Sequence, residues 1–235
     1  MKNIVIILAS GSGTRLGGNV PKQFLRLGDK MVVEHTLRAC DCGLFDKAVL
    51  VVNEDRVAEM QKCVALGNYD LPIDVVAGGS SRMESCKMGV DAIDEKQAFV
   101  VVHNGAQPFV SKDTLKGCLN ALRRHFAVVC GIPCVYTVLE VGADRMIRRV
   151  PPRAQCFRDM GPEGFRLDVL RKLLAIQDDT TMCANLTSVA HRYGLADVFV
   201  AEGDSLNIKI TYPLDVEIAK CIIRERQKLL SGHND

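Results

Sequence analysis

The sequence predicts an α/β fold built on a mainly parallel sheet with helices covering both faces. Two observations support this prediction. Short apolar runs rich in Val and Ile, such as IVIIL at 4–8 and FVVV at 99–102, alternate with stretches of helical periodicity. These runs are apolar on both faces, which is typical of strands buried between two helix layers.

The predicted elements alternate regularly up to residue 133 and again after residue 168. Apolar runs bounded by turn residues predict strands, and amphipathic stretches predict helices. The expected strands cover 4–8, 47–53, 73–77, 98–103, 127–133, 198–201 and 206–210. The expected helices cover 31–38, 55–66, 85–93, 111–125, 168–176 and 215–230.

The regular alternation breaks at about 134–157. Two alternating runs, VYTVLEV and RMIRRV, flank a Gly-Ala-Asp turn at 142–144, which is a hairpin signal. We expect an antiparallel β-arm that either projects to pair with another subunit or lies on its own domain. The sequence contains no repeat and no low-complexity linker, so one domain is expected over 1–235.

Composition excludes several functional classes. Of the 235 residues 48% are hydrophobic and 25% charged, and the net charge of +2 gives no support for a nucleic-acid or membrane-surface role. The apolar run near the N-terminus is too short for a signal peptide, and no stretch approaches the roughly 18 apolar residues of a membrane span. The ten cysteines form no C-x-x-C pair, which indicates small apolar filler in a reducing cytoplasm.

The loop after the first predicted strand carries the chemistry. It reads GSGTRLGGNVPK from 11 to 22, with four glycines, Arg15 and Lys22 and no acidic residue. Glycine allows backbone N–H groups to approach phosphate oxygens, and ligands of parallel sheets bind beyond the carboxyl ends of the strands. Leu16 stands where a dinucleotide fingerprint has its third glycine, and no G-K-[ST] ending is present. The loop therefore favours a triphosphate.

This loop resembles the sugar-nucleotidyltransferase signature A-x-G-x-G-x-R-x-G…P-K. The continuation PKQFL at 21–25 is similar to one branch, the 2-C-methyl-D-erythritol 4-phosphate and ribitol-5-phosphate cytidylyltransferases. Three further segments resemble that branch in order, namely GGSSRMES at 78–85, GPEGFR at 161–166 and AEGDSLNIKITYPLD at 201–215. Their joint order covers nearly the whole chain and is more specific than any single motif.

The resemblance implies a Rossmann-like three-layer nucleotidyltransferase fold, a homodimer formed through the β-arm, and a CTP site. It implies Arg15, Lys22 and Lys209 as catalytic cations. A phosphate acceptor is already ionised, so nucleotidyl transfer depends on positioning and positive charge rather than on a general base. The implied CTP-binding residues are Ala9, Ser10, Gly11, Ser12, Gly13, Gly79, Ser80, Arg82 and Ser85. Mg²⁺ is expected mainly on the CTP phosphates, with Asn104 as a further candidate ligand.

The acceptor side departs from the family pattern. The D-[AGS]-x-R-P turn reads NGAQP at 104–108, and the T-D-E-A-S segment aligns with ANLTS at 184–188. The candidate acceptor residues are Asn104, Gln107, Thr137 and Arg153. A basic group on the arm, Arg148, Arg149, Arg153 and Arg158, could bind an acceptor anion or simply face solvent.

The main expectation is therefore CMP transfer from CTP to a different phosphorylated polyol or phosphonate, with release of pyrophosphate. One alternative is authentic 2-C-methyl-D-erythritol 4-phosphate cytidylyltransferase activity in isoprenoid biosynthesis, and another is a catalytically inactive CTP-binding homologue. A third is an NAD-binding oxidoreductase, for which Glu54 or Asp55 would hold the ribose hydroxyls. That alternative leaves Pro21, Lys22 and the NIKIT segment at 207–211 unexplained.

Overall fold

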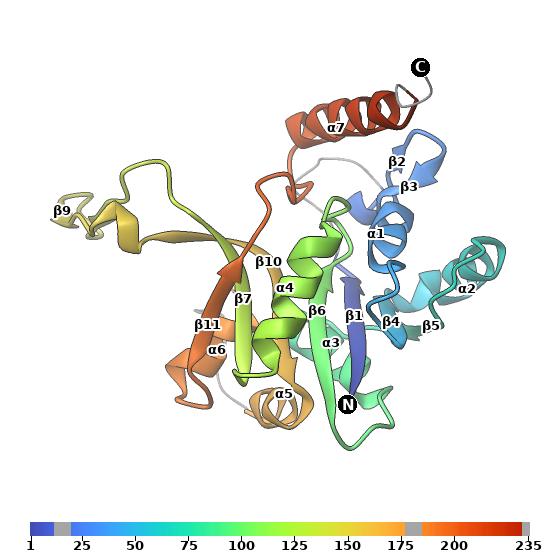
Figure 1. Cartoon of the computed structure of the whole chain (residues 1–235), viewed down its shortest axis with the longest axis horizontal. Helices are drawn as coiled ribbons and strands as arrows, with labels where there is room; N and C mark the ends of the chain where they lie inside the picture. The colour runs from blue at the N-terminus through green and yellow to red at the C-terminus, as the bar shows by residue number, and fades with distance from the viewer. Residues whose placement is uncertain (12–19, 177–184, 232–235) are drawn as a thin grey trace.

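The computed structural model describes residues 1–11, 20–176 and 185–231, and it is organised around one seven-stranded sheet (Figure 1). The strand order is β11-β7-β10-β6-β1-β4-β5. The strands are β1 (Lys2–Ala9), β4 (Lys47–Val52), β5 (Ile73–Ala77), β6 (Ala98–Asn104), β7 (Ala127–Pro133), β10 (Phe157–Arg166) and β11 (Val198–Glu202). The predicted α/β class is confirmed.

The sheet is parallel except for β10. Strands β6, β1, β4 and β5 pair in parallel, and β11 pairs in parallel with β7. Strand β10 lies antiparallel between β6 and β7, with Glu163 opposite Val102 on one side and Val129 on the other. The sequence did not predict this strand, because its Gly-Pro-Glu-Gly centre is poor in strand-forming residues.

Alternation along the strands divides the core between two helix layers. In β1, Val5 and Ile7 face one layer, whereas Ile4 and Ile6 face the other, and all four are fully buried. The first layer contains α1 (Val32–Cys40), α2 (Val57–Leu66) and α4 (Lys112–Leu122), and the second contains α3 (Arg82–Asp91), α5 (Leu167–Leu174) and α6 (Leu186–Arg192). Because neither face of β1 meets water, its unbroken apolar run is explained.

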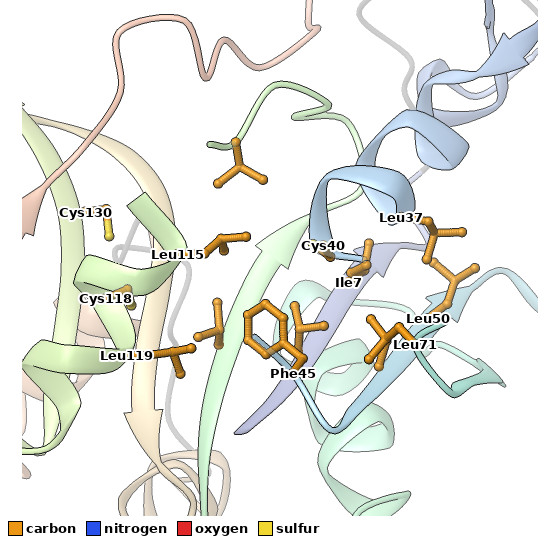
Figure 2. Packing of buried hydrophobic residues seen from close by; sticks show 14 of the residues in the cluster. Ile7, Leu37, Cys40, Phe45, Leu50, Leu71, Leu115, Cys118, Leu119 and Cys130 are labelled. Atoms are coloured by element: carbon orange, nitrogen blue, oxygen red, sulfur yellow. The ribbon is translucent and has the colours of Figure 1, made fainter. Parts of the chain in front are cut away.

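The first layer packs tightly against the sheet (Figure 2). Leu115, Cys118 and Leu119 of α4 lie on one part of it, and Leu37 and Cys40 of α1 lie on another. Each fully buried aliphatic side chain of this kind contributes about 1.5–3 kcal/mol of transfer free energy. The cysteines here behave as small apolar side chains, as the sequence suggested.

Local capping sets where the helices begin. Ser81 and Ser111 accept hydrogen bonds from backbone N–H groups in the first turns of α3 and α4, and Asn185 does the same for α6. Helix α6 was not predicted, because it spans only seven residues. No helix within the described ranges is long and apolar enough to span a membrane.

The β-arm follows β7 and projects from the body of the molecule (Figure 1). It carries a short hairpin of β8 (Glu140–Val141) and β9 (Ile147–Arg149), closed by a hydrogen bond from the Gly142 N–H to the Met146 carbonyl. The 3₁₀ helix η4 (Arg153–Gln155) then leads back into β10. The hairpin predicted around residues 142–144 is confirmed.

The predicted strand at 206–210 is wrong. This segment is irregular because Asp204 binds the N–H groups of Leu206 and Asn207, which turns the chain out of the sheet. The Ile210 N–H then donates to the Ala106 carbonyl at 2.9 Å, and α7 (Pro213–Ser231) follows. Helix α7 covers a separate apolar cluster with β2 (Arg26–Leu27), which pairs with β3 (Lys30–Met31).

Candidate active site

Two adjoining cavities lie at the carboxyl ends of the central parallel strands. The larger, the first cavity, is about 520 Å³ and is lined by Ala9 at the end of β1, Asn53 after β4 and Asn104 at the end of β6. The smaller, the second cavity, is about 240 Å³. Both include Arg82, Asn104 and Lys209 in their walls, so the two cavities share a common boundary.

The first cavity gathers most of the residues that the resemblance implied for CTP. It is lined by Ala9, Ser10, Gly11, Lys22, Gly79, Ser80, Arg82, Ser85, Asn104 and Lys209. Ser12, Gly13 and Arg15 lie outside the described residues. The two described ends of the predicted phosphate loop, Gly11 and Lys22, therefore line the same cavity as the 78–85 segment, although more than 50 residues separate them in the sequence.

A buried glutamine fixes the end of β1. The side-chain amide of Gln23 donates to the carbonyls of Ala9 and Gly11, each at 2.7 Å, and only 2% of this residue is exposed. Gln23 belongs to the 3₁₀ helix η2 (Lys22–Phe24), which also brings Lys22 to the cavity. The hydrogen bonds anchor the loop on both sides of Ser10.

The second anchor of the first cavity is the loop between β5 and α3. Ser10 Oγ donates to Ser85 Oγ at 2.8 Å, and the Gly79 N–H donates to Ser85 Oγ at 3.2 Å. A side chain at Gly78 would place its Cβ 2.7 Å from the Ser10 Cβ, so this close approach requires glycine. These contacts hold the Ser10 and Ser85 hydroxyls and the backbone at Gly78 and Gly79 in close contact.

Glu84 closes the same loop from outside the cavity. Its carboxylate accepts hydrogen bonds from the Ser80 N–H at 2.8 Å and from the Ser80 hydroxyl at 2.7 Å. These hydrogen bonds lower the pKa of Glu84, so it stays ionised. Ser81 is the N-cap of α3 and Glu84 lies three residues after it, which is the spacing of a capping box. This spacing could have predicted that the Glu84 side chain folds back onto the loop before the helix.

The cavities are supplied with cations from three separate elements. Lys22 lies on η2, Arg82 opens α3, and Lys209 lies on the irregular segment before α7. The bond from Ile210 to Ala106 sets Lys209 over the end of β6. Positive charge from several directions is what a triphosphate and its transition state require.

Amide side chains build the wall of the second cavity. Gln107 donates from Nε2 to the carbonyls of Met160 at 2.8 Å and Asn207 at 3.1 Å, and its Oε1 accepts from Asn104 Nδ2 at 2.5 Å. Asn207 donates to Met160 as well, at 2.8 Å. Gln107 is 4% exposed, and these three hydrogen bonds hold its side chain in the wall of the cavity.

An ion pair lies at the boundary between the cavities. Arg82 Nη2 is 2.8 Å from Glu163 Oε2, and Arg82 Nη1 donates to Asn104 Oδ1 at 2.5 Å. Glu163 is 3% exposed. Burial raises the pKa of Glu163, while the neighbouring Arg82 charge acts in the opposite direction. The sequence analysis marked the segment 161–166 but not Glu163 itself, because its partners Arg82 and Thr187 lie far away along the chain.

His103 lies beneath the turn at 104–108. Its Nε2 is 2.9 Å from the Gln107 carbonyl, which can only accept, so Nε2 carries the proton. Burial lowers the pKa of His103 to about 4. His103 is therefore neutral at physiological pH and acts as a structural donor.

Two predicted acceptor residues lie outside both cavities. Thr137 and Arg153 are exposed on the arm, and Arg153 donates to the Val135 carbonyl. Arg158, which we had grouped with the arm arginines, lines the second cavity together with Asp159. A role for Thr137 or Arg153 at an acceptor site would require a neighbouring subunit.

The donor set does not by itself form a magnesium site. Within residues 1–11, 20–176 and 185–231 no three His, Cys, Asp or Glu side chains gather as metal ligands. The side-chain oxygen of Asn104, Oδ1, already accepts a hydrogen bond from the Arg82 guanidinium. A cationic donor beside this oxygen disfavours a second cation on it.

Fold and site together place the chain among the nucleotidyltransferases. The chain belongs to the family described as "IspD: 2-C-methyl-D-erythritol 4-phosphate cytidylyltransferase", whose model matches residues 3–225. It is therefore a cytidylyltransferase, and the resemblance found in the sequence is confirmed. This membership removes the NAD-dependent oxidoreductase alternative.

Individual relatives agree along nearly the whole chain. The chain is 34% identical over 228 residues to "2-C-methyl-D-erythritol 4-phosphate cytidylyltransferase" of Thermobifida fusca (strain YX), covering 93% of this chain and 92% of that protein. It is 31% identical to the protein of the same name from Symbiobacterium thermophilum, covering 95% and 94%. The solved structure "4-diphosphocytidyl-2C-methyl-D-erythritolsynthase from Anaerococcus prevotii DSM 20548" superposes with a TM-score of 0.81 at 26% identity, covering 95% and 98%.

Proposed function

We propose that the protein transfers CMP from CTP to 2-C-methyl-D-erythritol 4-phosphate and releases pyrophosphate. The observation that carries this proposal is the common boundary of the two cavities, formed by Arg82, Asn104 and Lys209. The first cavity is suited to CTP and the second to a small phosphorylated polyol. The names of the relatives from Thermobifida fusca and Symbiobacterium thermophilum support this acceptor over the different polyol phosphate or phosphonate that the altered turn predicts.

The structure also weakens the reason for expecting a different acceptor. That expectation depended on the neutral residues Asn104 and Gln107 in the turn where the family has an acid and an arginine. The Gln107 amide donates to backbone carbonyls in the wall of the second cavity. The lining of that cavity still contains three cationic side chains, Arg82, Arg158 and Lys209. An acceptor phosphate would therefore still meet positive charge there.

In the proposed reaction, an acceptor phosphate oxygen attacks the α-phosphorus of CTP. The new P–O bond forms as the bond from the α-phosphorus to the α–β bridging oxygen breaks, and pyrophosphate carries away the electron pair. Lys22 and Lys209 stabilise charge on the non-bridging oxygens, and we assign the same role to Arg15. Pre-positioning of both phosphates supplies much of the remaining acceleration.

We propose that Ser10, Gly79, Ser80 and Ser85 contact the nucleoside part of CTP. Their hydroxyl and backbone groups line the first cavity and are fixed by the Ser10–Ser85 hydrogen bond. Mg²⁺ is proposed to be held by the triphosphate oxygens, since the described side chains supply no ligand cluster. When bound in this way the ion would neutralise phosphate charge.

We further propose a homodimer formed through the arm. Apolar side chains with more than half of their surface exposed gather there: Val135 at 72%, Tyr136 at 83%, Val141 at 56%, Met146 at 62% and Ile147 at 57%. An exposed apolar group of this kind favours a protein partner. Light scattering should give the dimer mass, and Ile147→Glu should shift it toward monomer. The control Leu66→Glu, at a side chain 86% exposed on α2, should leave the mass unchanged.

The function is tested by measuring pyrophosphate release with CTP, Mg²⁺ and a panel of acceptors. We expect turnover with 2-C-methyl-D-erythritol 4-phosphate to exceed that with ribitol 5-phosphate, erythritol 4-phosphate and a polyol phosphonate. Turnover of one of the other acceptors and not of 2-C-methyl-D-erythritol 4-phosphate would instead support the main expectation from the sequence, CMP transfer to a different acceptor. CTP binding without turnover of any acceptor would indicate the inactive homologue.

A further inference from the structure

Glu163 holds a position that the reaction described so far does not explain. It is a carboxylate in the middle of β10, 3% exposed, at the level of Val102 in β6 and Val129 in β7. Its Oε1 accepts from the Thr187 N–H at 2.8 Å and from the Thr187 hydroxyl at 3.2 Å. Its Oε2 accepts from Arg82 Nη2 at 2.8 Å.

Arg82 is thereby clamped between two acceptors. Glu163 takes one terminal nitrogen and Asn104 Oδ1 takes the other, at 2.8 and 2.5 Å. A guanidinium has five N–H donors, so each terminal nitrogen keeps a second N–H after these two bonds. The Arg82 side chain is 34% exposed and lines both cavities.

The clamp continues into the wall of the second cavity. Asn104 is bonded to Gln107, and Gln107 to the backbone at Met160 and Asn207. Side chains from α3 and β10 are therefore linked with the turn after β6 and with the segment that carries Lys209. Moving Arg82 would disturb both cavities at once.

Stability alone does not account for this arrangement. Taking a carboxylate out of water is costly, and a buried ion pair often contributes little net stability. The groups that face Glu163 are Arg82 from α3, the Thr187 N–H and hydroxyl from α6, and Asp159 from its own strand, and burial raises the pKa of Glu163. A costly buried charge at the edge of a ligand cavity is typical of a functional site.

We propose that Glu163 is a positioning residue that fixes the Arg82 guanidinium at the boundary of the two cavities, where its remaining N–H groups bind phosphate oxygens of CTP and of the acceptor. The inference depends on the proposed function for the acceptor but not for the nucleotide. Because the Arg82–Glu163 pair has no net charge, Arg82 contributes directed donors, whereas Lys22 and Lys209 contribute net charge. The fixed geometry spares the side-chain entropy that a free arginine would lose on binding.

The test is a double-mutant cycle read out by CTP binding alone. Calorimetry on the full chain compares Glu163→Ala, Arg82→Ala and the double variant with the wild type. We expect each single variant to weaken CTP binding by about 10- to 100-fold, the range for one lost charge-assisted hydrogen bond. The double variant should bind no more weakly than Arg82→Ala, since Glu163 acts only through Arg82.

Further variants separate positioning from structural support. Glu163→Gln keeps an oxygen that can accept from Arg82 and should restore most of the CTP affinity. Thr187→Val removes the hydroxyl contacts to Glu163 Oε1 and to Asn185 Oδ1 but leaves the bond between Glu163 and Arg82. It should therefore lower the melting temperature and leave CTP affinity within about two-fold. If Glu163→Ala unfolds the protein, Glu163→Met takes its place in the cycle, because Met fills a similar volume but has no oxygen to accept from Arg82. Glu163→Met should then weaken CTP binding by about 10- to 100-fold while Glu163→Gln does not, and equal affinities in the two variants would contradict the inference.

Two results would overturn the inference. One is CTP affinity unchanged in Glu163→Ala but reduced in Arg82→Ala. The other is multiplication of the two single effects in the double variant, which would make the residues independent. A wild-type protein that binds CTP but fails to turn over 2-C-methyl-D-erythritol 4-phosphate contradicts the proposed acceptor instead, and the cycle on CTP binding still decides the role of Glu163.

Discussion

The two cavities are built in different ways. The wall of the first consists largely of backbone groups and short hydroxyls from two loops, held by the Ser10–Ser85 bond. The wall of the second is held together by side chains that join distant elements, with Gln107 and Asn207 bonded to backbone carbonyls and Arg82 bonded to Glu163. Backbone walls depend on a few consecutive residues, whereas side-chain walls depend on which distant elements meet. The wall of the first cavity can therefore keep a recognisable sequence motif while the residues of the second wall differ from the family pattern.

The largest expected effect is at Lys209, the lysine among the three residues common to both walls. Lys209→Ala should lower kcat/KM by about 10²–10³, because one cation that stabilises the transition state is lost. It should raise KM for both substrates, whereas Lys22→Ala should raise KM for CTP alone, since Lys22 lines only the first cavity.

Steady-state kinetics with each substrate varied in turn make this measurement. Lys220→Ala is the matched control, because Lys220 is exposed on α7 and pairs with Glu217. An effect of Lys209→Ala confined to one substrate would break the idea of a common boundary.

The next effect separates the second wall from the first. Gln107→Leu should leave the Met160 and Asn207 carbonyls without their Gln107 donors, which costs about 1–3 kcal/mol. The melting temperature should fall by about 2–4 °C for each kcal/mol lost. KM for the acceptor should rise, and CTP affinity should fall much less, because Gln107 reaches Arg82 only through Asn104.

Differential scanning fluorimetry and calorimetry measure these quantities. Gln61→Leu, an exposed position on α2, controls for exchange of an amide for an apolar side chain. Equal losses of CTP and acceptor binding in Gln107→Leu would mean that the two walls are not separable.

A pH effect is expected from His103, which supports the turn of the second wall. Its pKa is lowered by burial to about 4 in the folded state, against an ordinary value near 6.5. As the pH falls, His103 therefore binds a proton in the unfolded chain before it does so in the folded chain. The contribution of His103 to the free energy of unfolding is fully present above pH ~6.5 and is lost toward pH ~4, by up to about 1.4 kcal/mol per pH unit.

Urea unfolding between those pH values tests the effect. In His103→Gln the stability should depend less on pH over this window, whereas His191→Gln, at an exposed position on α6, should behave like the wild type. An unchanged slope in His103→Gln would contradict the assigned cause.

The smallest effect is expected at the outer anchor of the first wall. Glu84→Gln replaces the carboxylate that accepts two hydrogen bonds from Ser80 with a neutral amide, which weakens both bonds. The loop between β5 and α3 should therefore become less ordered, and CTP binding should weaken modestly. Acceptor KM should not change, since Glu84 does not line the second cavity. Calorimetry with CTP checks this, with Glu217→Gln on α7 as the control.

Much of this molecule could be predicted from local sequence. The apolar runs at 4–8, 47–53, 73–77, 98–103 and 127–133 became strands, and the fold class followed. The motif residues of the nucleotide side converged on the first cavity as expected, within the part of the chain that the structure describes. Local signals suffice here because strand burial and loop backbone geometry are encoded by neighbouring residues.

The antiparallel strand β10 and the pairing of Glu163 with Arg82 were decided only by the tertiary structure. The strand has a weak local preference, and it forms because β6 and β7 offer it hydrogen bonds on both edges. The same placement buries Glu163 opposite an arginine 81 positions earlier in the chain. Asn104 and Gln107, the candidate acceptor residues of the altered turn, are hydrogen-bonded partners in the wall of the second cavity. The sequence by itself determined the fold class and the candidate residues of a nucleotide site, because both are encoded by neighbouring residues. Long-range packing decided how the wall of the second cavity is held together, because its hydrogen bonds join distant elements.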